Sequence, residues 1–170
     1  MPQVFAARDK ENGAMTTIQN QDMSLASTSL LEHQVLNHVK QALRVILDWD
    51  APEVSLPRKL SSLQFTMKSF ARHLERVMSI EEEGGYLDDV IAARPNLESR
   101  IIALNRDHLR FRTRVKLIST RLESLHNWQE DQFAGLCMEI YELLDAVDRH
   151  DEREIDVLQE SLLTDDGGEG

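Results

Sequence analysis

Cysteine is nearly absent from this sequence. Cys137 is the single cysteine, so the chain can form neither an internal disulfide framework nor a cluster of thiolate metal ligands. A lone cysteine within a helical pattern is more often a small core residue than a reactive thiol, and we expect that role for Cys137.

Glycine and proline are also scarce, with seven and four among 170 residues. There are few β-branched runs, whereas Leu, Glu, Arg and Ala are abundant, and this composition favours helices over strands. A chain of this length buries a real core within one domain. We therefore predict an all-α fold.

Positive charge is in deficit. Against 30 Asp and Glu there are 19 Lys and Arg, and the net charge of −11 argues against a nucleic-acid partner and an anionic membrane surface. No apolar run approaches the ~20 residues that a membrane-spanning helix needs. The first residues lack the basic start and apolar block of a signal peptide, so we expect a cytoplasmic protein.

The sequence divides into three parts. Residues 1–26 are polar and aperiodic and predict a disordered lead-in, residues 27–163 predict one helical domain, and residues 164–170 predict an acidic disordered tail. Within the domain, a capping-box spacing opens a first helix at Ser29 that stops near Trp49. Further helices are expected over residues 58–83, 97–125 and 131–163, with a short helical turn over 86–94 and left-handed glycine caps at 84 and 85. Four long amphipathic segments with short connections predict an antiparallel up-down-up-down four-helix bundle.

Polar side chains interrupt the apolar seams of these helices. The last seam is aliphatic for four positions and then presents His150 and Glu154 one turn apart. The second seam runs into Glu81, and His108 is the one polar member of the third. Imidazole and carboxylate groups at core positions need compensation, and a cation held between the helices would supply it.

These interruptions fall at one level of the predicted bundle. Residues equally far from a shared connection have the same height in an antiparallel bundle, and each residue adds ~1.5 Å of rise. The polar seam residues lie roughly 16 to 23 residues from the nearest connection, which is one level within the error of predicted helix ends. We therefore predict a metal site formed by His33, Glu81, His108, His150 and Glu154.

Two other histidines are weaker candidates for ligands. His38 falls on an alternative apolar line of the first helix, but it lies ~7 Å from the level of His33, which favours a half-buried, hydrogen-bonded histidine. His73 flanks the second seam, where a surface position or an outer contact to the site is favoured over ligation.

Each predicted ligand also has a purely structural interpretation. His108 alone could be a core histidine that donates to a backbone carbonyl, and Glu81 and Glu154 could be seam ends open to water. Only their convergence favours a metal. The neighbouring acids are expected to form a solvated face: Glu82, Glu83, Asp151 and Glu152.

In this order, the motifs resemble those of the hemerythrin-like (HHE cation-binding) family over nearly all of residues 30–163. Residues 32–36 (EHQVL) are similar to the first-helix ligand motif, and the pair Asp107-His108 is similar to the acid-His pair of the third helix. Residues 150–154 (HDERE) match the H-x-x-x-E of the fourth helix, and residues 81–87 (EEEGGYL) are similar to the end of the H-x-x-x-E-E motif of the second.

The resemblance implies a four-helix bundle whose centre holds a carboxylate-bridged pair of irons or another metal. It also implies a role in binding oxygen, in sensing oxygen, redox state or nitric oxide, or in handling iron. The chain departs from the family at Val77, where the second helix would carry a histidine, and on the third helix, where His108 has no histidine four residues away. Fewer histidines than the family usually has argue against a reversible oxygen carrier.

We therefore expect a metal-binding protein with iron as the preferred ion, either di-iron bridged by Glu81 and Glu154 or mononuclear, with other divalent metals open. Its free coordination positions would accept dioxygen, peroxide or nitric oxide. Sensing or storage is favoured over catalysis, because the sequence has no nucleophile-base pair and no phosphate-binding glycine loop. Tyr86, Asp107 and Glu32 are expected to orient the ligands.

Two alternatives remain open. A degenerate bundle that has lost its metal would serve as a protein interaction module or a homodimer. A metal-dependent oxidase or peroxidase would consume peroxide.

Overall fold

The computed structural model describes residues 28–49, 55–84, 86–125 and 130–163, and nearly all of them are helical. No strand occurs among these residues, so the predicted all-α class is confirmed. The predicted lead-in over residues 1–26 and the predicted tail over residues 164–170 lie outside the described part.

Four long helices and two short ones make up the described part. Their order is a first helix over residues 28–47, α2 (Leu56–Glu83), α3 (Tyr86–Ala93), the 3₁₀ turn η1 (Pro95–Leu97), α4 (Glu98–Ser124) and α5 (Glu130–Leu163). A proline in the first turn of α2 suits that position, because it has no N–H to leave unpaired. The ammonium of Lys59 caps the preceding helix end by donating to the carbonyl oxygens of Leu47 and Trp49, at 2.8 and 3.0 Å.

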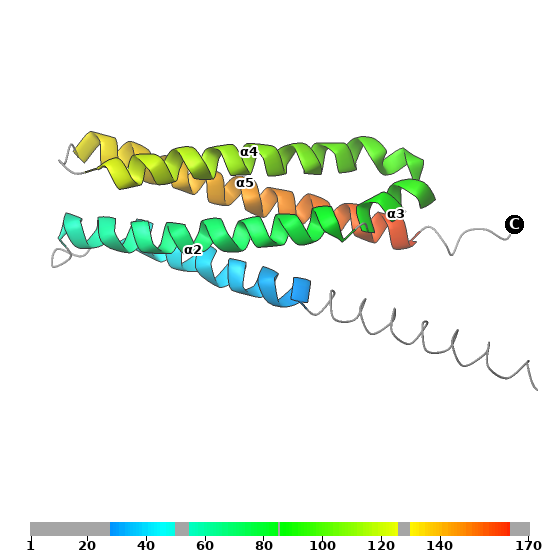
Figure 1. Ribbon diagram of the computed structural model, residues 1–170, viewed down its shortest axis with the longest axis horizontal. Helices are drawn as coiled ribbons and strands as arrows, with labels where there is room; N and C mark the ends of the chain where they lie inside the picture. Colours follow the sequence, from blue (N-terminus) through cyan, green and yellow to red (C-terminus); the bar gives the residue numbers. More distant parts are fainter. Residues whose placement is uncertain (1–27, 50–54, 85, 126–129, 164–170) are drawn as a thin grey trace, which may run out of the picture.

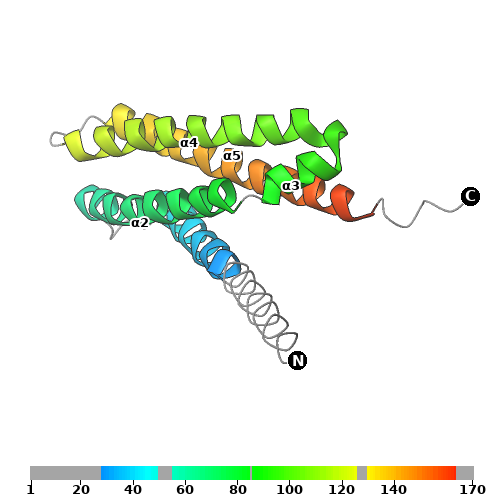
Figure 2. The ribbon, with the colours of Figure 1, turned by 45° about the vertical axis from the view of Figure 1, so that its right-hand side comes forward.

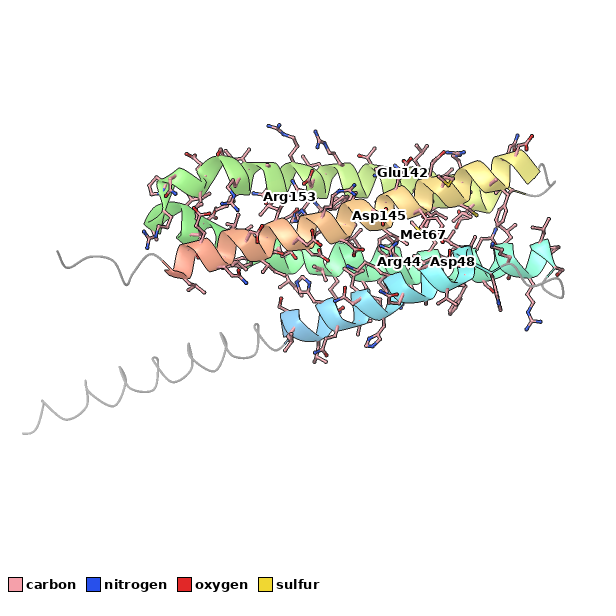
Figure 3. The ribbon with its side chains drawn as sticks, turned by 180° about the vertical axis from the view of Figure 1, so that it is seen from behind. Arg44, Asp48, Met67, Glu142, Asp145 and Arg153 are labelled. Atoms are coloured by element: carbon pink, nitrogen blue, oxygen red, sulfur yellow. The ribbon has the colours of Figure 1, made fainter. Side chains whose placement is uncertain are left out.

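The long helices lie side by side (Figure 1). Helix α5 lies against α4 and against the first helix, which also runs next to α2. Figure 2 shows the start of the first helix diverging from α2. Ion pairs join the first helix to α5, where Arg44 contacts Asp145 at 3.1 Å (Figure 3). Lys40, itself buried, contacts Asp148 and Asp151 at 2.7 and 2.8 Å.

Two apolar cores lie one after the other along the helices. The larger fills the space between the long helices and includes Val77 of α2, Phe111 of α4 and Val147 of α5. The smaller lies under α3 and η1 and includes Leu104 of α4 and Val157 of α5. Between the two cores, α4 and α5 carry buried polar side chains: Asp107, His108, His150 and Glu154. A polar layer therefore separates the two cores.

The turn after α2 brings α3 back over the end of that helix. Gly84 donates its N–H to the carbonyl oxygen of Ile80 at 2.8 Å, and a Cβ on Gly84 would lie 2.7 Å from that oxygen. Its φ of −68° is right-handed, so the left-handed cap predicted for this glycine is wrong. The close approach to Ile80 explains why glycine is needed here. Gly85 lies outside the described residues.

None of the described helices is both long enough and apolar enough to cross a membrane.

Candidate metal centre

The five predicted ligands come together in the polar layer. Glu81 lies in the last turn of α2, His108 near the middle of α4, and His150 and Glu154 one turn apart on α5. Four of them are buried, and the side chain of His33, near the start of the first helix, is 30% exposed. The level predicted from helix lengths is therefore the level at which these side chains meet.

Their ligand atoms form two groups that share one residue. In the first group, Glu81 meets His108 and His150, and in the second it meets His33 and Glu154. Within each group the atoms lie within 4.8 Å of one another. Glu81 therefore belongs to both groups and connects them.

The two oxygens of Glu81 face different groups. Oε2 lies 3.0 Å from Nε2 of His108 and 3.9 Å from Nε2 of His150, whereas Oε1 lies 3.4 Å from Nε2 of His33. The Nε2 atoms of His108 and His150 lie 3.1 Å apart. Each carboxylate oxygen can thus serve a separate cation.

These separations fit ligands around a metal ion. Bonds of ~2.0 to 2.2 Å from nitrogen or oxygen to a divalent ion place adjacent ligands of one ion about 3 to 4 Å apart. The distances from Glu81 Oε2 to the two imidazoles, and between the imidazoles, all fall in this range. Two imidazoles with one carboxylate also form the donor set that leaves open positions on non-haem iron.

Charge in the layer is balanced by shared protons. Burial alone would raise the pKa of Glu81, but its contacts with His108, His150 and His33 hold it well below its usual range. The hydrogen bond to Glu81 raises the pKa of His33 despite burial. A cation can replace these protons, because it satisfies the same carboxylate and the same imidazoles.

The second carboxylate behaves in the opposite way. Burial and the repulsion from Glu81 raise the pKa of Glu154. The hydroxyl of Tyr86 donates to Glu154, and burial together with this carboxylate raises the pKa of Tyr86, so the phenol keeps its proton and remains a donor. Tyr86 therefore makes the orienting contact that the sequence predicted for it.

The other expected orienting residues differ from one another. Asp107 places Oδ2 3.7 Å from Nδ1 of His150, too far for a hydrogen bond, and that buried nitrogen has no hydrogen-bond partner among the described residues. Glu32 contacts Nδ1 of His73 at 3.0 Å and Nε of Arg76 at 2.8 Å. Among the described residues, Glu32 thus contacts His73 and Arg76, neither of which is one of the five candidate ligands, so the orienting role expected for it is not seen.

Glu82 is exposed, as expected for the solvated face, but its carboxylate also contacts a candidate ligand. Its Oε1 accepts a hydrogen bond from Nδ1 of His108 at 2.9 Å, and two bonds from Arg112, at 2.7 and 2.9 Å, fix the carboxylate. A proton on Nδ1 leaves the Nε2 lone pair of His108 free to ligate. The sequence alone does not indicate which glutamate of the run over residues 81–83 contacts α4. Asp151 departs from the solvated face, because it pairs with the buried Lys40.

The remaining histidine candidates lie away from the centre. His38 is exposed on the first helix, so the half-buried position predicted for it is wrong. His73 is partly buried and contacts Glu32. Neither belongs to the groups of converging ligand atoms among the described residues.

A cavity of about 300 Å³ lies beside Glu81, between the end of α2, the start of α3 and α4. Glu81 lines it together with Glu82 and Asp88, while Arg112 is its one basic side chain. Ion pairs with Glu75 and Glu82 compensate that arginine. A small molecule or a cation can therefore approach Glu81 along an acidic wall.

Comparisons with protein family models, with curated proteins and with solved structures find no match to this chain. Fold and site alone define its class, an all-α protein with a buried layer of histidine and carboxylate side chains.

Replacing Tyr86 with Phe is expected to weaken metal binding by about 10-fold to 100-fold, because loss of an outer partner frees a ligating carboxylate to turn away. Tyr141→Phe is the matched control, since the Tyr141 hydroxyl donates to Asp48 between the first helix and α5, away from the polar layer. Anaerobic calorimetric titration with ferrous iron measures both. Equal affinities in the two variants would show that the Tyr86 contact is not part of the site.

Proposed function

We propose that this chain is a hemerythrin-like, antiparallel four-helix bundle that binds a pair of non-haem irons. Glu81 would bridge them, His108 and His150 would complete one site, and His33 and Glu154 the other. One observation carries the proposal: two buried or partly buried ligand groups share a carboxylate whose two oxygens face different groups.

The bundle arrangement is supported by the way the long helices meet. Helices α4 and α5 lie side by side (Figure 1), and Lys40 and Arg44 join the first helix to α5. Arg112 of α4 reaches Glu75 of α2. Short connections between neighbouring long helices favour antiparallel packing.

Iron is preferred because the donor set mixes imidazole with carboxylate, which suits both of its common oxidation states. A bound pair would supply open coordination positions for dioxygen, peroxide or nitric oxide. The protein contributes the rest: Glu82 holds the tautomer of His108, Tyr86 holds Glu154, and the two apolar cores exclude water from either side.

The size of the cavity beside Glu81 favours a role in sensing oxygen, redox state or nitric oxide, or in handling iron, over the turnover of a large substrate. The cavity beside Glu81 has room for a small molecule or an ion. Its acidic lining favours the entry of a cation. We infer that small ligands reach the open positions by this route.

Metal analysis tests the proposal directly. Protein produced with added iron and purified without chelator is expected to carry more than one iron per chain. EDTA should lower its melting temperature by roughly 5 to 10 °C, since occupancy at 100 times Kd adds about 2.7 kcal/mol and a chain of this size melts about 2 to 4 °C higher per kcal/mol. Less than about 0.2 metal per chain, with melting unchanged by EDTA, would overturn it.

A metal-free interaction module is the second candidate, and one surface feature favours it. The outer face of the first helix has an alternating four- and three-residue pattern of exposed side chains, Leu31, Val35, His38, Ala42 and Val45, and all but His38 are apolar. This spacing is that of a helix pairing seam.

A second copy of the chain is the partner that this face suits. Between Gln34 and Val45 the charged residues Lys40 and Arg44 are turned to α5 by ion pairs. The outer face is therefore neutral in a chain of net charge −11, and two copies can meet there without repulsion. Metal-free protein that sediments as a dimer and melts identically in EDTA would favour this candidate over the metal centre.

A further inference from the structure

A second cavity, of about 350 Å³, lies between α4 and α5 and is strongly basic. Arg110 and Arg114 of α4 and Arg149 and Arg153 of α5 line it, and Asp107 is its one acidic side chain. Four of the 19 basic residues of an acidic protein thus surround one cavity. Figure 3 shows Arg153 on α5 at the side of α4.

The charge of these arginines is only partly compensated. Asp107 accepts hydrogen bonds from Arg110 at 3.3 Å and Arg153 at 2.6 Å. Arg114 pairs with the carboxylate of Glu142 at 3.7 Å and donates to the backbone carbonyl oxygens of Glu139 and Glu142, at 3.4 and 3.5 Å. For the guanidinium of Arg149, no ion pair or hydrogen bond occurs among the residues that the structure describes. The cavity therefore keeps a surplus of positive charge.

We propose that this cavity binds a small oxyanion with two or more negative charges, a free phosphate-like or polycarboxylate molecule, and that the anion strengthens metal binding. Guanidinium groups match oxyanions because their planar N–H donors form paired, charge-assisted hydrogen bonds. A volume of about 350 Å³ suits a small ligand. Two arginines from each helix can contact one such anion from both sides.

Asp107 links the cavity to the metal centre. Its Oδ2 accepts a hydrogen bond from Arg153 at 2.6 Å and lies 3.7 Å from Nδ1 of His150, the buried nitrogen for which the described residues supply no hydrogen-bond partner. A ligating histidine usually donates its other N–H to a carboxylate or carbonyl. An anion that engages Arg153 frees Oδ2 to accept that hydrogen bond. This step rests on the proposed function, because it requires His150 to be a ligand.

Sulfate binding to the metal-free protein tests the cavity without the metal. Calorimetric titration with sodium sulfate, against sodium chloride at equal ionic strength, is expected to show one site. Arg149→Gln and Arg114→Gln should each weaken it at least about 10-fold, since a charge-assisted hydrogen bond is among the stronger polar contacts. Arg72→Gln removes the same charge from an exposed position on α2 and should leave the affinity unchanged. Equal affinity in all three variants, or no binding, would overturn the anion site.

Metal titration with and without sulfate tests the link. Saturating sulfate is expected to raise the affinity for ferrous iron at least about five-fold, the lower end of ordinary coupling between sites. Arg149→Gln should remove this gain and keep the affinity seen without sulfate, and Asp107→Asn should remove it as well. Sulfate that binds without changing metal affinity would overturn the link alone. Sulfate binding in a protein that takes up no metal would overturn the proposed function and leave the cavity standing.

Discussion

Glu81→Gln is expected to lower the affinity for iron by at least about 100-fold at both sites. The amide keeps the volume of the side chain, but it is neutral and offers one oxygen, so it cannot bridge two cations. Glu81 is also the carboxylate that contacts His33, His108 and His150. Each of the other four candidate ligands belongs to one group only, so its removal should weaken binding at that site and leave the other site less affected.

Glu83→Gln is the matched control for that experiment. Glu83 lies two residues further along α2, is exposed, and carries the same charge. Metal content and anaerobic ferrous iron titration of the two variants, with melting curves in EDTA to verify folding, give the comparison. If the Glu81→Gln and Glu83→Gln variants bind the same amount of iron with the same affinity, Glu81 does not bridge two ions, and the proposal of a pair of ions is wrong.

Acidification is expected to release the ions while the protein stays folded. The hydrogen bond to Glu81 raises the pKa of His33 above its ordinary 6.5. Burial lowers the pKa of His108, but its contacts with Glu81 and Glu82 outweigh burial and raise it. Ligating imidazoles are neutral, so an ion must displace both protons. The logarithm of the affinity should therefore rise by up to about two per pH unit below these raised pKa values and level off above them.

Histidine variants of the first helix test whether His33 contributes to this dependence of the affinity on pH. His33→Gln should reduce it by about one, because one displaced proton is lost. His38→Gln, on the exposed side of the same helix, should leave it unchanged. Titrations from about pH 6 to about pH 8.5 in non-coordinating buffers measure the slopes. An affinity that does not vary with pH would mean that the imidazoles are not the ligands.

Without metal, stability should depend on pH in the opposite sense. A histidine whose folded pKa is raised stabilises the fold below its unfolded pKa, and this contribution is lost as pH rises through the folded value. In EDTA, the melting temperature should therefore fall as pH rises above about 6.5. With excess iron it should rise, because tighter binding adds stability. Parallel trends with and without iron would contradict the exchange of protons for metal.

Much of the helical framework could be predicted from the periodicity of apolar residues. Expected helices over 58–83, 97–125 and 131–163 correspond to α2, α4 and α5 within two residues at each end. Side chains on one face of a helix recur at fixed intervals, so the seam is visible in the chain itself. The end of α2 at Gly84 was predicted, but its right-handed conformation was not, because it depends on the approach of the Ile80 carbonyl, which residue type alone does not encode.

The convergence of the five candidate ligands could also be predicted from the sequence, because polar residues interrupt seams that are otherwise apolar. Counting residues from the connections places them at one height. What the count cannot supply is the rotation of each helix about its axis. That rotation decides that Oε1 and Oε2 of Glu81 face different groups.

The order of residues is enough to predict that the described part of this protein is helical, which faces of its helices are apolar, and at which level polar groups enter those faces. Only the tertiary structure decided that Glu82 contacts His108, that Lys40 is buried against Asp148 and Asp151, and that four arginines surround one cavity. Long charged side chains extend far enough to contact any of several residues on adjacent helices. Which of these contacts forms depends on interhelical distances and angles, and a local sequence pattern does not contain them.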